Sequence, residues 1–229
     1  MKKNILIFIA CIITSAGLFA EDDGVDRELL FYAGFANDKT SVKEIEASYT
    51  AKQFMVGADF CALVKPVDMF GIGLSCGAGC GIGLTDNMKI ESPWGTLHGN
   101  NGKGLSLSYY LEIGPAIAFY LGSILRIGGN FCYTYGFKKD DAFQYKVKDF
   151  NYSTIIKTPY GGFSTNVQAK FFPNILISPV FGWKYTRGFS TCINIHTSSS
   201  DVNYKESTHH RYKYSFYRNL YYAGLSVKL

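Results

Sequence analysis

The sequence has no concentrated charge of either sign. Its 229 residues include 23 Lys and Arg and 18 Asp and Glu. If the first 20 residues are removed as a leader, Lys2 and Lys3 go with them, and 21 basic residues face 18 acidic ones, a net charge of +3. Nucleic-acid binding needs a concentrated basic face, so this balance excludes a nucleic-acid partner.

Cysteine is scarce and odd in number. Of six cysteines, Cys11 falls in the presumed leader and five remain, most of them inside predicted strands. They are Cys61, Cys76, Cys80, Cys132 and Cys192. An odd set with no regular spacing does not fit a disulfide framework, so we expect small apolar fillers.

Catalytic and metal-binding patterns are also missing. The four histidines, His98, His196, His209 and His210, all fall in predicted loops. Spacing brings no Ser, His and carboxylate together, and the adjacent His209 and His210 would point opposite ways on a strand. We therefore predict no enzyme, no metal and no cofactor.

Two short motifs fail in their context. Gly73-Leu74-Ser75-Cys76-Gly77 matches a nucleophile elbow, which requires a strand, a sharp turn and then a helix. Here the alternating pattern simply continues, so Ser75 is a small interior residue. Gly73 and Gly77 also match G-x-x-x-G, but the segment is shorter than the ~20 apolar residues of a membrane helix.

What the sequence does have is strict alternation. From Phe70 to Leu84, large apolar residues take one parity and small ones the other, and a period of two indicates a strand. The small parity forms a glycine wall of Gly71, Gly73, Gly77, Gly79, Gly81 and Gly83. A soluble strand would turn charged residues to water. This one fits the wall of a closed barrel, apolar outside and narrow inside.

The same alternation recurs along the chain. The predicted strands are 29–36, 52–64, 70–84, 105–121, 125–137, 162–171, 175–186 and 217–229. The long connections between them are 37–50, 85–103, 138–158 and 187–214. Long and short connections alternate, which is typical of an eight-stranded antiparallel up-and-down transmembrane β-barrel with long extracellular loops. An even strand number places both termini on the periplasmic side.

One alternative competes for the middle of the chain. The segment from Leu105 to Leu125 is apolar enough to pass as a membrane helix. A helix would scatter Glu112 and the alternating serines around its circumference, whereas a strand collects them on one face. The strand interpretation is favoured.

The N-terminus resembles a secretory signal peptide. Residues 1–20 contain two lysines, an apolar core and small residues, and acidic residues follow. Lipid attachment at Cys11 is disfavoured, because cleavage there would halve the apolar core. We expect a signal peptide at 1–20, a short periplasmic leader at 21–27 and the barrel at 28–229.

Several charged residues are predicted to point inward, and those assigned to a charge network in the lumen are Asp59, Glu112, Lys184 and Arg218. A confined carboxylate is costly without a cation, so Glu112 should pair with Lys184 or Arg218. An eight-stranded lumen is only wide enough for side chains to fill. The sequence thus predicts a plugged interior without an aqueous channel.

Aromatic residues are abundant and gather toward strand ends. The predicted outer girdle is Tyr109, Tyr135, Phe137, Trp183, Tyr185 and Tyr217. The predicted periplasmic girdle is Phe70, Phe119 and Phe171. Such girdles mark the two interfaces of a membrane.

Taken together, the signal peptide, eight amphipathic strands, four long loops and the C-terminal segment from Tyr221 to Leu229 resemble the small outer-membrane barrels of the OmpA-transmembrane, OmpX and OmpW kind. The Tyr-rich, Cys-containing, Gly-lined style is similar to small barrels of treponemal spirochaetes. The resemblance covers residues 28–229 as a pattern of alternation. It implies a C-terminal signal read by the assembly machinery, made here by Tyr221, Leu225, Val227 and Leu229, although the last residue of such proteins is usually aromatic.

The resemblance also bounds the function. It implies a monomeric, non-enzymatic protein in outer-membrane lipid, whose loops meet the environment or ligands of a host. An alternative is an OmpW-like conduit for small hydrophobic molecules. A third possibility is a lipid-modifying enzyme with Ser and His near the outer rim.

Overall fold

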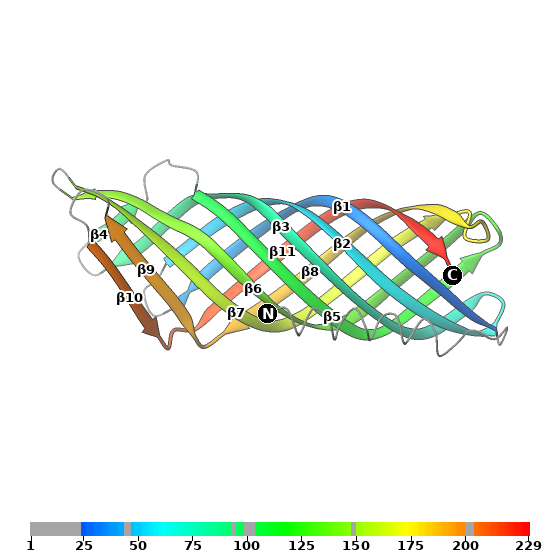
Figure 1. Ribbon diagram of the computed structural model, residues 1–229. Coiled ribbons are helices and arrows are strands. Elements are labelled where there is room, and N and C mark those ends of the chain that lie inside the picture. Colours follow the sequence, from blue (N-terminus) through cyan, green and yellow to red (C-terminus); the bar gives the residue numbers. More distant parts are fainter. Residues whose placement is uncertain (1–23, 44–46, 93–94, 99–103, 148–149, 200–203) are drawn as a thin grey trace.

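The computed structural model describes residues 24–43, 47–92, 95–98, 104–147, 150–199 and 204–229 (Figure 1). The predicted signal peptide, 1–20, lies outside these ranges. Within them, no helix is long and apolar enough to cross a membrane.

The described residues form eleven strands: β1 (Val25–Val42), β2 (Ala47–Val67), β3 (Phe70–Ser92), β4 (Gly95–His98), β5 (Gly104–Leu121), β6 (Leu125–Val147), β7 (Phe150–Phe171), β8 (Ile177–Ser190), β9 (Ile193–Ser199), β10 (Tyr204–His210) and β11 (Tyr214–Lys228). Eight of them close a ring in the order β1, β2, β3, β5, β6, β7, β8, β11, and β11 pairs back with β1. Every neighbouring pair is antiparallel. The predicted fold, an eight-stranded antiparallel barrel, is confirmed.

Side chains alternate between the inside and outside of the ring. Along β1, every second residue from Asp26 to Val42 is buried, and from Phe31 on the residues between them are exposed. The segment from Leu105 to Leu125 forms β5, its turn and the first residue of β6, so the helix alternative is wrong. Period-two alternation was therefore the correct guide to local structure.

The segments predicted as long loops are mostly strand. β1 continues to Val42, β3 to Ser92 and β6 to Val147, and 187–214 contains the β9–β10 hairpin. The barrel also begins before the predicted residue 28, because β1 starts at Val25. In 37–41 and 138–141, inward and outward residues are both polar, so hydrophobicity shows no period there although the backbone still pairs.

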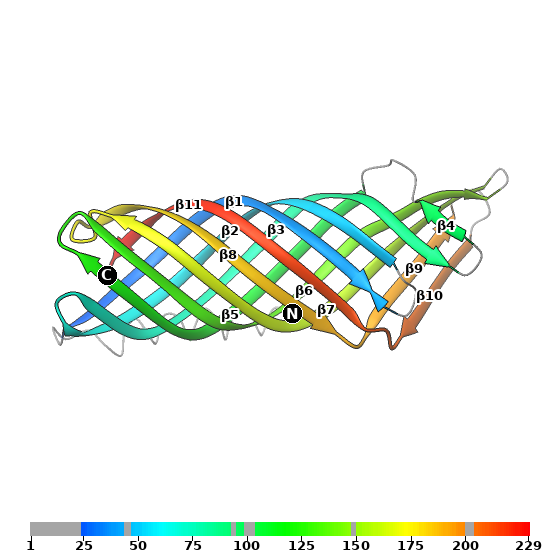
Figure 2. The same ribbon diagram turned by 180° about the vertical axis from the view of Figure 1, so that it is seen from behind.

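The two ends of the barrel differ. Short turns join β2 to β3, β5 to β6 and β7 to β8 at what we call the lower end, where the C-terminus also lies (Figure 1). Gly122 adopts a φ of +64° in one of these turns, a conformation that favours glycine. At the opposite, upper end, β9 pairs with β7 and carries β10, and β4 pairs with β3 (Figure 2).

The outer face is an apolar belt. Phe35, Leu74, Ile113 and Tyr221 are each at least 60% exposed, and similar residues continue around the ring. The inner face, in contrast, holds buried Asp, Glu, Lys and Arg. This inversion of a soluble protein is what a barrel surrounded by lipid requires.

Aromatic rings fill much of the interior. Five of these rings each lie over a glycine directly opposite on the next strand, and a Cβ at that glycine would meet the ring at 2.1–2.7 Å. The pairs are Tyr32 with Gly57, Tyr110 with Gly79, Tyr160 with Gly136, Tyr222 with Gly182 and Phe216 with Gly188. These glycines make room for rings that lie flat along the wall.

Candidate functional site

The interior carries three layers of charge, and the middle one is built around Gly77 of β3. Asp59 of β2 and Glu112 of β5 are each directly opposite Gly77, so the two carboxylates flank it on the inner face. Lys184 reaches them from β8: its Nζ donates to Glu112 Oε1 at 2.6 Å and to Asp59 Oδ2 at 3.1 Å. All three side chains are buried. We call them the middle layer.

The two carboxylates of the middle layer are not equally satisfied. Ser164 Oγ donates to the second oxygen of Glu112 at 2.8 Å. Among the described residues, Asp59 Oδ1 accepts no hydrogen bond. One ammonium group therefore serves two buried carboxylates, and Asp59 is the less well stabilised of the two.

The predicted pairing of Glu112 with Lys184 is observed, whereas Arg218, the alternative partner, does not join this group. It lies directly opposite Asp38 of β1 and holds it with two hydrogen bonds, Nε to Oδ1 and Nη2 to Oδ2, both 2.8 Å. A planar guanidinium matches a carboxylate in this two-pronged geometry. The sequence missed Asp38 because it falls in the segment predicted as a loop.

Two further charged residues complete the upper layer. Lys138 Nζ lies 3.3 Å from Asp38 Oδ2 and 3.1 Å from Asp140 Oδ2. Tyr49 donates to Asp140 Oδ2 at 2.6 Å. The upper layer is thus Asp38, Lys138, Asp140 and Arg218, with two charges of each sign.

An apolar cap covers the upper layer. It consists of Val42, Ile156, Tyr160, Ile193, Tyr214 and Phe216, all buried. The outward residues at the height of Tyr49 and Tyr214, such as Ser41 and Lys43, are polar, so both tyrosines lie above the apolar belt. Burial raises the pKa of Tyr49 and raises the pKa of Tyr214 to about 12, so both phenols stay neutral.

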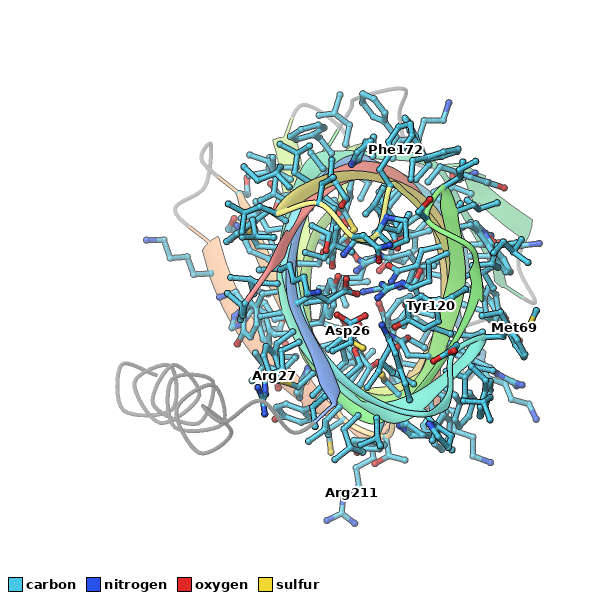
Figure 3. The ribbon with its side chains drawn as sticks, turned by 90° about the vertical axis from the view of Figure 1, so that its right-hand side faces the viewer. Asp26, Arg27, Met69, Tyr120, Phe172 and Arg211 are labelled. Carbon is cyan, nitrogen blue, oxygen red and sulfur yellow. The ribbon has the colours of Figure 1, made fainter. Side chains whose placement is uncertain are left out.

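The lower layer is centred on Glu28. Arg126 Nη2 donates to Glu28 Oε1, and Lys170 Nζ donates to Glu28 Oε2 at 2.7 Å. Below them Tyr120 donates to Asp26 Oδ2 at 2.6 Å, and both side chains point into the barrel in Figure 3, which looks along it from the lower end. Glu28 was missed because the strand was predicted to start one residue later.

The space left between the lower and middle layers is small. A cavity of about 20 Å³ lies between the lower and middle layers, lined by Asp59, Ser75, Arg126 and Asn130 among others. That volume holds about one water molecule. Three buried charge layers and the apolar cap thus occupy the interior along its length.

The glycine wall lies where these groups need space. A Cβ would meet Asp59 Oδ1 at 2.1 Å at Gly77, Tyr110 at 2.7 Å at Gly79 and Gln53 at 2.9 Å at Gly81. Gly71 faces Tyr120 at 3.3 Å, whereas Gly73 and Gly83 lie against backbone carbonyls of β2. Larger side chains at these glycines would displace the side chains that fill the interior.

The predicted girdle residues form contacts on the outer face. At the lower end Phe70 packs on Phe119 and Phe171 on Phe181, with ring centroids 5.2 and 6.2 Å apart. Toward the upper end the pairs are Tyr109 with Phe137, Trp183 with Tyr185, and Tyr185 with Tyr217, at 5.6, 6.2 and 6.4 Å. Tyr135 is 55% exposed.

The predicted C-terminal signal lies on β11, next to β1. Tyr221, Leu225 and Val227 share the outward register, and Leu229 N donates to Arg27 O at 3.0 Å just beyond the strand. Recognition by an assembly machinery stays a prediction.

Cysteine and histidine do not form a reactive group among the described residues. The five described cysteines are free thiols, with Cys132 buried inside and Cys80 exposed outside. His196 lies on β9, and the side chains of His98, His209 and His210 lie outside the described part of the chain. Within that part, no three His, Cys, Asp or Glu residues come together as metal ligands.

Comparison with known proteins adds to this geometry. No protein-family model matches the chain, and no curated protein matches it in sequence. The solved structure of the outer membrane protease OmpT from Escherichia coli is similar, with 11% identity, a TM-score of 0.51, and coverage of 90% of this chain and 97% of that one. This chain has the fold of the small outer-membrane β-barrels. At this identity the likeness shows the fold alone.

Two further barrels have lower scores. OprG from Pseudomonas aeruginosa matches with 10% identity and a TM-score of 0.48, covering 88% of this chain and 95% of its own. The Neisserial surface protein NspA matches with 10% identity and a TM-score of 0.44, covering 88% and 97%. The similarity to spirochaete barrels stays a prediction.

Proposed function

We propose that the protein is a non-enzymatic outer-membrane anchor that closes its own lumen and presents its upper end to the environment or a host. The observation that carries this proposal is the filled interior. Lys184 spans the lumen to two carboxylates, and charged layers lie above and below it. A barrel built this way serves to hold its ends in place and offers ions no path.

The upper end supports the same proposal. β6 has 23 residues and β7 has 22, about twice the 9–11 residues that a strand needs to cross a bilayer. β9 and β10 widen this extension into a four-stranded sheet beyond the ring. The chain thus places a large ordered surface at one end, which we assign to the cell exterior, with both termini periplasmic.

Sidedness can be tested on intact cells. An epitope inserted after Ser199 should bind antibody on intact cells, whereas one inserted after Asp68, in the turn between β2 and β3, should bind only after permeabilisation. The reverse pattern contradicts the proposed orientation.

The role of the upper sheet needs a separate experiment. Replacing 193–210 with a flexible linker removes β9 and β10 and leaves the eight ring strands intact. Cells with the shortened protein should lose binding to surfaces coated with host extracellular glycoproteins, while the extracted barrel keeps its heat-dependent gel mobility. Equal binding by both cell types would remove the surface-presentation proposal.

A second candidate, a side entrance for small hydrophobic molecules, has one observation in its favour. In β7, residues 152–157 pair with β9 and residues 161–170 pair with β8. A groove of about 710 Å³ opens where the partner strand changes. Tyr135, Phe189 and Cys192 line it. A bulky thiol reagent at exposed Cys192 should slow uptake of an apolar dye by cells, and Cys192→Ser should abolish this sensitivity. Unchanged uptake after modification speaks against the side entrance.

A further inference from the structure

A second groove, of about 600 Å³, crosses the outer face of β11, β1, β2 and β3 near the top of the apolar belt. These four strands lie side by side on one wall of the barrel (Figure 2). The exposed side chains of the groove belong to the outward register, so it is separate from the charged layers inside. They are Phe35, Asn37, Lys52, Phe54, Ile82, Leu84 and Tyr221.

The groove has a polar row and an apolar row, fixed by strand register. The polar row, one residue from each of three adjacent strands, is Asn219, Asn37 and Lys52. The row two residues lower on the same strands is Tyr221, Phe35 and Phe54. Two residues span about 7 Å of strand, so the groove crosses the level at which the apolar belt gives way to polar surface.

Three basic side chains border the polar row. Lys52 belongs to it, and Lys39 lies two residues above Asn37 on β1. Tyr217 is directly opposite both Lys39 and Arg187, and the Arg187 guanidinium lies 5.4 Å from the centre of its ring. All three cations are exposed.

Unlike the cations inside the barrel, Lys39, Lys52 and Arg187 have no carboxylate partner among the described residues. Inside, Arg126, Lys138, Lys170, Lys184 and Arg218 each form an ion pair. On the outer face of β6, Lys139 lies 3.6 Å from Asp141. An anion held between these side chains would be attracted by all three charges.

We infer that this groove binds a membrane lipid with a phosphate-bearing headgroup. The phosphate meets Lys39, Lys52 and Arg187, and an acyl chain lies along the apolar row below. Phe35 is 73% exposed and Tyr221 65%, a surface that a soluble anion would leave uncovered. A phospholipid of the outer rim matches the groove in both charge and apolar surface.

Native mass spectrometry of the detergent-extracted protein tests the inference, with dioleoyl phosphatidic acid and dioleoyl phosphatidylcholine as probes of equal acyl chains. The wild type should retain phosphatidic acid about tenfold more strongly, since each basic residue near a charged lipid surface contributes appreciably. The variant Lys39→Gln/Lys52→Gln/Arg187→Gln should lose this preference. The matched control Lys205→Gln/Lys228→Gln/Arg211→Gln, which also removes two lysines and one arginine from exposed positions, should keep it.

The apolar row and the lipid source are tested in the same assay. Phe35→Ser/Tyr221→Ser should lower retention of both lipids. Millimolar glycerol 3-phosphate should not displace bound phosphatidic acid. Equal retention of the two lipids by the wild type, an equal loss of preference in both triple variants, or displacement by the soluble phosphate overturns the inference. Heat-dependent gel mobility shows in each case that the barrel has folded.

Discussion

Lys184 Nζ lies 2.6 Å from Glu112 Oε1, across the lumen from the strand that carries the carboxylate. This contact joins β8 to β5, which are not neighbours in the ring. Removing one partner of a buried ion pair strongly destabilises a protein, because the remaining charge is buried without an opposite charge beside it. The middle layer therefore offers sharp tests of the interior.

Asp59→Asn and Glu112→Gln should have different effects, although each removes one carboxylate from the same lysine. Asp59 Oδ1 has no partner among the described residues, whereas Glu112 also accepts from Ser164. We expect Asp59→Asn to maintain or raise the temperature at which the detergent-extracted barrel unfolds. Glu112→Gln should cost about 1–3 kcal/mol, since it weakens a satisfied buried charge. Equal losses would show that the layer has no surplus carboxylate.

Gly77→Ala should destabilise the barrel, since the new Cβ would lie 2.1 Å from Asp59 Oδ1. Gly128→Ala is the matched control, because this inward glycine of β6 has its nearest neighbour at 3.2 Å, the Ile117 carbonyl. Adding Asp59→Ala to Gly77→Ala should restore part of the lost stability. Thermal unfolding followed by gel mobility measures all three variants, and equal behaviour of the two glycine variants would contradict the steric account.

The sequence predicted those parts of the fold that depend on alternating hydrophobicity. In the Phe70–Leu84 segment, apolar residues alternate with residues that are mostly glycine, so the sequence predicted both the strand and its two faces. The upper parts of the strands were not. In 138–141, inward Lys138 and Asp140 alternate with outward Lys139 and Asp141, and no apolar residue marks either face.

The candidate site shows the same division. Parity placed Asp59, Glu112, Lys184 and Arg218 inside, but it could not choose a partner for each. Glu112 and Lys184 meet because their strands face one another across the ring, while Arg218 meets Asp38 because the two are cross-strand neighbours. The level of an inward residue along the barrel axis depends on the stagger of the strands around the ring. The alternation of inward and outward residues within one strand does not give that stagger.

Leu74→Arg should cost about 2–4 kcal/mol, the penalty for a cation near the middle of a bilayer. Leu74 is 64% exposed on the outward face of β3. Leu74→Ile, which keeps the apolar surface, should change little. Refolding into vesicles followed by denaturant titration gives the difference, and equal tolerance of the two variants would show that this face does not meet lipid.

The wild-type protein should be silent in planar-bilayer recording, because three charge layers and the apolar cap lie in series along the lumen. For the same reason Glu112→Ala alone should not conduct: it thins the middle layer but leaves Arg218 on Asp38 above and Arg126 on Glu28 below. Steady ohmic conductance is expected only when all three layers and the apolar cap are reduced together, as in Glu28→Ala/Asp38→Ala/Glu112→Ala combined with Tyr160→Ala/Phe216→Ala, provided that the variant still folds by gel mobility. Conductance in the wild type would show that the interior is not plugged. Openings from Glu112→Ala alone would show that the middle layer is the sole barrier.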